Sequence, residues 1–422
     1  MFHPRRRTRN DKVYLNMKVA AIITCMRHRS HAHVILENFL EPYLFNGRVV
    51  ESGCEIVSMY VDQFPSSDMA RDVADQYGIR IYPTIREAVC NGGRRLGVDA
   101  VLSIAEHGRY GHTRRGQKRY PRKRFLDEIF EVFQASGRSV PVFNDKHLSY
   151  RWDWAEQIYQ RSQREGIPLM AGSSVPLAQR DPPLALPHAA DITEAVSIHG
   201  GPVEAYDFHA LEVLQSLIES RRGGETGVSR IEFLDGKRLW NAARRGRWSA
   251  ELAEAAMAAE LGAAPKSLRR IPGERVVPQH GVIIHFVDGL KATMLTVGKS
   301  DTRWNFACRL KGKSKIQATA LRVGPWQNRN LFKALSHAIQ DHFRNARPPY
   351  PLERTLLTTG LVEAIMHARE TPGVELATPH LELTSRARKF SAFCERGASW
   401  QKITDEVPEP RGITGYPYDG RS

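Results

Sequence analysis

Short apolar runs alternate with stretches of helical spacing over the first 172 residues of the chain. Continuous apolar runs of this length are typical of strands that are buried on both faces of a parallel sheet. A regular alternation of such strands with helices predicts a doubly wound sheet with right-handed crossovers. We therefore expect an α/β protein that begins with a Rossmann-like, doubly wound parallel sheet. The expected strands are residues 18–24, 55–62, 79–82, 98–104, 140–143 and 168–172.

The second half has a different pattern, in which several strands follow one another. The Asp288-Gly289 pair between two strand segments is a typical hairpin turn. This order predicts an α+β domain with an open, predominantly antiparallel sheet. Its expected helices are residues 204–218, an alanine-rich helix within an insert at 240–261, 330–344 and 356–370.

These patterns divide the chain into four parts. A basic N-terminal tail (1–17) precedes the Rossmann-like domain (18–172). The α+β domain follows (173–383), and a polar tail rich in proline and glycine, which we expect to be loosely held, ends the chain (384–422).

Composition excludes several classes of protein. The chain is 41% hydrophobic and 25% charged, with no apolar run of the ~18 residues that a membrane span requires. The N-terminus lacks a secretion signal and the five cysteines are scattered, so we expect a cytoplasmic protein without disulfides. The net charge of +15 suits an anionic small molecule, and no nucleic-acid-binding motif accompanies it. We therefore expect a small-molecule substrate, no membrane and no nucleic acid.

Lys146 follows the strand expected at 140–143. Open α/β sheets bind their ligands beyond the carboxyl ends of their strands, so a lysine at this point can act on a ligand. Desolvation there lowers the pKa of a lysine towards the range of a useful acid or base. The alternative is a surface lysine that opens a loop.

Other polar residues are candidates for the same site. His209 and Glu212 lie three residues apart on the helix expected at 204–218, where they are neighbours. Asp62 ends a predicted strand, where an acid can accept hydrogen bonds from a ribose. A cluster at 108–124 contains eight basic and no acidic residues, among them Arg114, Arg115 and Lys118. We interpret this cluster either as a lid over an anionic substrate or as a solvated excursion.

Histidines are frequent near the first predicted helix, but their spacing does not predict a metal site. His28, His31 and His33, with His107 and His112 further on, are the histidines concerned, but His28 and His31 are unevenly spaced loop residues with no carboxylate at a ligand offset.

The order of these elements resembles the Gfo/Idh/MocA family of NAD(P)-dependent oxidoreductases, which act mostly on sugars and polyols. The resemblance spans roughly residues 19–383. Lys146 is similar to the lysine of the family's Glu-Lys-Pro signature, with Asp145 and His147 in place of its glutamate and proline. The other matching segments are residues 77–82, 98–101, 106–107 and 347–351.

The resemblance implies an enzyme and assigns roles to several residues. Lys146 and His209 would be catalytic, Glu212 would match the family's later acid, and Asp207 matches its earlier acid only poorly because position 205 is alanine. Asp62 would hold the adenosine ribose of NAD. Residues 18–172 would bind the dinucleotide and residues 173–383 the substrate, and the free face of the second sheet would mediate a homodimer or homotetramer. Glu106, His107 and Asp145 would lie along the cofactor.

One departure concerns the cofactor. The family's first strand leads into a glycine-rich phosphate turn, whereas this chain has no glycine between Val19 and Asn46. Basic and hydroxyl side chains at the start of the first helix are the groups left to bind a phosphate there. These residues are Thr24, Arg27, Arg29, Ser30 and His31.

Three functions remain open on this reading. The first is hydride transfer between NAD, with NADP as the other possible cofactor, and a sugar-like or polyol substrate. The second is a lyase, isomerase or hydrolase that uses Lys146 and His209 on an anionic substrate without a dinucleotide. The third is a non-catalytic protein whose basic segment holds a phosphorylated ligand.

Overall fold

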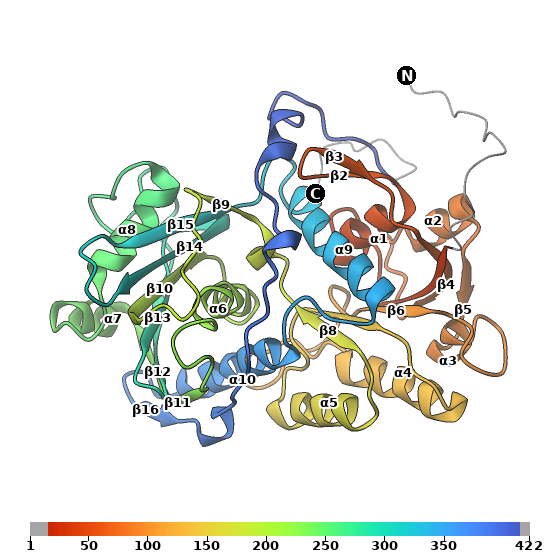
Figure 1. The fold of residues 1–422 in the computed structure, drawn as a ribbon, viewed down its shortest axis with the longest axis horizontal. Helices are drawn as coiled ribbons and strands as arrows, with labels where there is room; N and C mark the ends of the chain where they lie inside the picture. Colours follow the sequence, from red (N-terminus) through yellow and green to blue (C-terminus); the bar gives the residue numbers. More distant parts are fainter. Residues whose placement is uncertain (1–15, 414–422) are drawn as a thin grey trace.

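The first domain is organised around a six-stranded parallel sheet (Figure 1). We describe residues 16–413 in a computed structural model. The sheet order β5-β4-β1-β6-β7-β8 grows outward from β1 in both directions, so the topological switch point lies between β1 and β6. This confirms the predicted doubly wound fold. The strands are β1 (Met17–Ile23), β4 (Cys54–Val61), β5 (Arg80–Tyr82), β6 (Ala100–Ile104), β7 (Val142–Asp145) and β8 (Leu169–Gly172).

Both faces of this sheet are buried, as the continuous apolar runs predict. Val19, Ala21 and Ile23 of β1 face one core, and Ala20 and Ile22 face the other. The first core is covered by α1 (His31–Leu40), α2 (Ala70–Tyr77) and α9 (Asn328–Asn345), and the second by α3 (Ile85–Val89), α4 (Arg122–Ser136) and α5 (Trp152–Arg164).

The second domain contains an eight-stranded sheet in the order β16-β11-β12-β13-β10-β14-β15-β9. Every neighbouring pair is antiparallel except β10 and β13, which are parallel. The predicted mostly antiparallel sheet is therefore confirmed. The strands are β9 (Gln179–Asp181), β10 (Ile192–Gly200), β11 (Val228–Asp235), β12 (His280–Phe286), β13 (Lys291–Thr296), β14 (Ser300–Leu310), β15 (Gln317–Arg322) and β16 (Glu375–Ala377).

This second sheet is open, as predicted, because its end strands β16 and β9 do not pair with each other, but helices cover both of its faces (Figure 1). One face packs on α6 (Ala205–Ile218) and α10 (Leu352–Ala368). The other packs on α7 (Gly236–Arg244) and α8 (Ala250–Leu261), which are formed by the insert. The face that we expected to be free for a homodimer or homotetramer is thus covered by the chain itself. Self-association stays a prediction, and it would need another surface.

The described part of the C-terminal segment makes specific contacts with the first domain, which its polar composition does not predict. It returns to the first domain and reaches the small hairpin of β2 (Tyr43–Phe45) and β3 (Arg48–Val50), where the Gly47 N–H donates to Ser399. Further on, Glu409 pairs with Arg29 and Arg329. Buried polar groups therefore hold a segment that offers few apolar residues. Within residues 16–413, no helix has the length and apolar character needed to cross a membrane.

Replacing Trp248 with alanine tests the packing of the insert on the sheet. Trp248 is 1% exposed and donates its indole N–H to the carbonyl of Leu239 over 2.9 Å. We expect the free energy of unfolding to fall by about 3–5 kcal/mol because a large cavity forms beneath α7 and α8. Urea unfolding measures this loss. Val276→Ala, at a residue that is 66% exposed, is the control and should stay within about 0.5 kcal/mol of the wild type. Equal stability of the two variants would contradict the described packing.

Candidate functional site

Lys146 and His209 line one cavity at the carboxyl ends of the parallel strands. The cavity has a volume of about 360 Å³ and is shared by the two domains. Lys146 comes directly after β7, and His209 lies in the first turns of α6. The two residues that the sequence predicted as the centre of the site therefore meet. The cavity is also lined by Arg29, His31, Glu106, His107, Tyr206 and Trp304.

Lys146 is held in place by its backbone and by one carboxylate. Its φ is 64°, and its backbone N–H donates to the carbonyl of Gly172 over 3.1 Å. Its Nζ lies 3.1 Å from Oε1 of Glu106, which also pairs with Arg122. Burial disfavours the charge on Glu106, but Lys146 and then Arg122 outweigh it and hold the pKa of this carboxyl well below its usual range. Glu106 therefore stays ionised between two cations.

His209 is positioned by Ser173. Its Nδ1 lies 2.6 Å from the Ser173 hydroxyl, which leaves Nε2 as the ring nitrogen for a ligand. Ser173 in turn accepts the Val175 N–H at 3.0 Å and donates its own N–H to Oε2 of Glu212 over 3.3 Å. Burial lowers the pKa of His209 well below its usual value, so the ring is neutral near pH 7.

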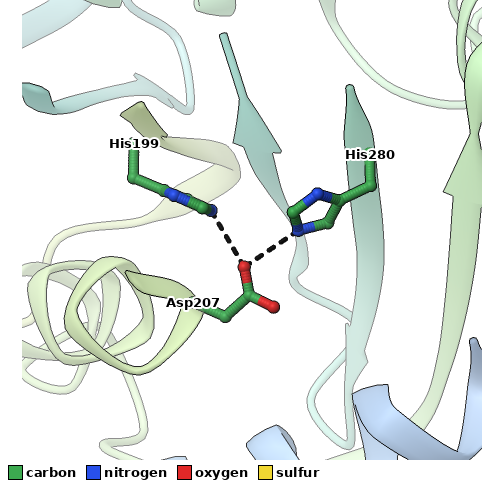
Figure 2. A group of neighbouring side chains, drawn as sticks. All are labelled: His199, Asp207 and His280. Carbon is green, nitrogen blue, oxygen red and sulfur yellow. Dashed lines mark hydrogen bonds and ion pairs between the residues drawn. The ribbon is translucent and has the colours of Figure 1, made fainter. Parts of the chain in front are cut away.

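Glu212 and Asp207 do not reach the cavity, although both were predicted as catalytic. Glu212 is fully buried and accepts hydrogen bonds from Thr355 and Thr358 at 3.1 and 2.7 Å, so it acts on His209 only through Ser173. Asp207 binds His199 and His280, each at 2.9 Å (Figure 2). Neither acid is therefore in a position to exchange a proton directly with a ligand in the cavity.

Backbone N–H groups in the turn between β1 and α1 donate hydrogen bonds to side chains of the protein. Asp68 accepts the Met26 N–H at 2.6 Å, and Ser30, the N-cap of α1, accepts the Arg27 N–H at 2.9 Å. The buried hydroxyl of Thr24 donates to the carbonyl of Glu106. These backbone donors are consequently not offered to a ligand in the way that a glycine-rich turn offers them.

The turn also carries two arginine side chains that were predicted to bind a cofactor phosphate. The guanidinium of Arg29 pairs with Glu409 and donates to Gln327 over 3.0 Å. The Nε of Arg27 is buried without a hydrogen-bond partner within residues 16–413. Arg29 lines the cavity, whereas Arg27, Thr24 and Ser30 do not.

Two further acids predicted near the cofactor are engaged within the chain. Asp62 accepts hydrogen bonds from Tyr60 at 2.7 Å and Tyr110 at 2.5 Å and pairs with Arg124. Burial opposes the charge on Asp62, but these donors together lower the pKa of its carboxyl. Asp145 is 1% exposed and lies 2.6 Å from Nδ1 of His31, so it orients a residue of the cavity wall.

The basic segment 108–124 is tied to its surroundings. Arg115 pairs with Glu370 at 3.0 Å, and the backbone N–H of Lys118 donates to Glu204 over 3.0 Å. Arg114 is exposed, and none of these three predicted substrate ligands lines the cavity. Their role in substrate binding stays a prediction without a contact in its favour.

An aromatic wall was missed by the sequence analysis. The rings of Tyr206 and Trp304 stack with centroids 5.0 Å apart, and Trp304 meets the ring of His209 edge-on at 5.3 Å. Tyr206 stands three residues before His209 on α6, which is a signal that helical spacing could have provided. Trp304 comes from β14, and no local pattern links it to α6.

Solved structures of similar shape include dehydrogenases. A myo-inositol dehydrogenase from Lactobacillus casei, in complex with NAD(H) and myo-inositol, matches with a TM-score of 0.55 and 10% identity over 89% of this chain and all of that one (100%). GenD2 from gentamicin A biosynthesis, in complex with NAD, matches at 0.54 and 11% over 90% and 99%. A myo-inositol dehydrogenase from Corynebacterium glutamicum matches at 0.53 and 12% over 86% and 99%.

The chain has the fold of these dehydrogenases. No protein-family model matches its sequence, and no curated protein matches it either. The fold predicted from the order of elements is therefore confirmed, and its use in this chain must be argued from the cavity.

Burial of His107 predicts a pH-dependent stability. Burial, with His31 next to it, lowers the pKa of His107 from 6.5 to about 4. The unfolded chain takes up this proton near pH 6.5 and the folded chain only near pH 4, so stability falls as the pH falls through this window. His107→Asn, which tolerates the φ of 69°, should reduce the slope by up to about 1.4 kcal/mol per pH unit. Urea unfolding across the window measures both slopes, and identical slopes would contradict the assignment.

Proposed function

We propose that this protein is an oxidoreductase that removes or adds a hydride at a hydroxyl-bearing carbon of a small polyol or sugar-like substrate. The observation that carries this proposal is the meeting of Lys146 and His209 in one cavity beyond the carboxyl ends of the parallel strands. The similar solved structures are of dehydrogenases, including two of myo-inositol, which supports the same reaction class. A place in the Gfo/Idh/MocA family is part of this proposal.

The size and walls of the cavity suit a small ring-shaped substrate. A volume of about 360 Å³ lies within the range of small-molecule sites. The stacked rings of Tyr206 and Trp304 give it one flat apolar side, while Lys146, His107 and His31 supply polar groups on the other lining elements. A polyol has both apolar C–H faces and hydroxyl edges, which match this division.

His209 and Lys146 divide the handling of the proton between them. Nε2 of His209 is placed to accept the hydroxyl proton, because Nδ1 is already bonded to Ser173. The ammonium of Lys146 positions the same hydroxyl and favours its ionisation, and Glu106 holds that ammonium at 3.1 Å. Since Glu106 also pairs with Arg122, its position does not depend on the substrate.

The cofactor in this proposal is NAD, whose nicotinamide would supply or accept the hydride. Its pyrophosphate would be held by side chains, since the backbone donors of the β1–α1 turn are taken. Arg27, with its unpartnered buried Nε, and Arg29 have the charge that a pyrophosphate requires. Glu409 would have to leave Arg29 when the phosphates bind.

Lys146→Met tests the catalytic centre. The substitution removes the charge and keeps the length of the side chain, and Arg122 still neutralises Glu106, so the fold should survive. We expect kcat/KM to fall by about 10²–10⁴-fold in an assay of nicotinamide absorbance with a panel of polyols and sugars. Lys123→Met is the matched control, because Lys123 pairs with Asp127 outside the cavity. A folded Lys146→Met variant with full activity would remove this assignment.

Glu409→Gln tests whether Arg29 binds the pyrophosphate of the cofactor. Loss of a partly exposed ion pair frees Arg29, so binding of NADH should tighten by about 2–5-fold. Titration of nicotinamide fluorescence with NADH and NADPH measures this change. Glu406→Gln, at an exposed residue of the same segment, should leave affinity unaltered. Equal affinities in both variants would contradict the role given to Arg29.

One observation favours a second candidate function. Asp62 and the backbone of the β1–α1 turn are engaged within the chain, and both would be needed for a dinucleotide bound in the usual way. A lyase, isomerase or hydrolase could use Lys146 and His209 on an anionic substrate without any dinucleotide. Absence of NAD(H) and NADP(H) binding by the folded wild type, together with turnover that needs Lys146, would favour this candidate over the first.

A further inference from the structure

Three elements of the second domain bring two histidines and an acid together (Figure 2). His199 lies near the end of β10, Asp207 in the first turn of α6, and His280 at the start of β12. Thr296, the last residue of β13, adds a hydroxyl beside them. All four residues are at most 5% exposed, and the ligand atoms of the first three lie within 4.8 Å of one another.

The polar atoms form a closed ring. Oδ1 of Asp207 lies 2.9 Å from Nε2 of His199 and 2.9 Å from Nε2 of His280. The Thr296 hydroxyl lies 3.3 and 3.2 Å from the same two nitrogens, and 2.8 Å from Nδ1 of His280. A cation inside a ring of this size would lie about 2 Å from each atom, which is the usual distance of zinc from nitrogen and oxygen ligands.

The charge of Asp207 needs a partner of this kind. Its side chain is completely buried, and within residues 16–413 no lysine or arginine pairs with it. Its second oxygen accepts the backbone N–H of Glu204 at 3.2 Å. A buried carboxylate is costly unless a proton or a cation compensates it. Two imidazoles and one carboxylate are a common ligand set of divalent transition metals.

A route to the cluster exists. A second cavity, of about 600 Å³, is lined by His280 and Thr296 and also by Lys299, Asp301 and Arg369. Through these two residues the cavity offers a metal ion an entry path to the cluster. The cluster is separate from the cavity of Lys146, since the stacked rings of Tyr206 and Trp304 lie between His199 and His209.

We propose that His199, Asp207 and His280 bind one divalent transition-metal ion of the zinc type, with Thr296 next to it. Binding through Nε2 leaves the proton of His199 on Nδ1. The 3.3 Å hydrogen bond that Nδ1 accepts from the Gly201 N–H therefore opens when the metal binds. The alternative occupant is a proton, which would leave the ring as a buried hydrogen-bonded cluster. This proposal does not depend on the proposed oxidoreductase function.

Measuring metal binding by the full-length protein decides whether the cluster holds a metal ion or a proton. The purified chain is freed of metal with a chelator and titrated with Co²⁺, followed by visible absorption, and with Zn²⁺ in competition. We expect stoichiometric binding and a rise in Tm with Zn²⁺, because a ligand that binds the folded state stabilises it. Failure to bind either ion stoichiometrically would overturn the proposal in favour of the proton.

Two variants and one spectrum locate the site. His280→Gln should weaken binding by more than about 100-fold, since even outer-shell partners contribute 10–100-fold. His285→Gln, on the same strand and half-buried, should bind as the wild type does. Equal binding by both variants would place the metal elsewhere and overturn the proposal. If His280→Gln does not fold, X-ray absorption of the Co²⁺-loaded wild type decides. Two imidazole ligands around the cobalt would support the site, and a spectrum without imidazole ligands would overturn it.

Discussion

A buried carboxylate holds the candidate site together. Glu106 follows β6, Lys146 follows β7, and Arg122 opens α4, so one ionised group joins three elements at the carboxyl edge of the sheet. Thr24 at the end of β1 adds a fourth by donating to the Glu106 carbonyl. Loss of Glu106 would leave two buried cations unpaired, at a cost of about 3–5 kcal/mol. The position of Lys146, and with it the shape of the cavity, depends on this arrangement.

The sequence predicts most of the first domain because its strands are short, apolar and separated by amphipathic helices. Lys146 and His209 were found for related reasons, since a strand end and a helix face can be read locally. The two edge strands of the second sheet, β9 and β16, and the neighbouring strand β15 escaped prediction because they are short and partly exposed, so they carry little apolar periodicity. The first residues of β14 are polar and partly exposed, so the sequence predicts this strand only from Trp304 onward.

Long-range partners explain the remaining differences. Asp207 looks like an acid for His209 because the two are close on one helix, yet it binds His199 and His280 from two separate strands. Asp62 looks like a ribose ligand, yet Tyr110 and Arg124 reach it from the basic segment. The insert was predicted only as an alanine-rich helix, and its Trp248 and Leu252 pack against the sheet. In each case the deciding contact lies far along the chain.

The position of α9 affects when the first domain can fold during synthesis of the chain. Phe332, Leu335 and Ile339 of this helix belong to the same core as Val19 and Ile23 of β1. The first sheet therefore lacks part of the cover of one face until residues more than 300 positions later have left the ribosome. An N-terminal half that is expressed alone would expose that apolar surface and would tend to aggregate. The two domains are distinct in architecture but form a single folding unit in biosynthesis.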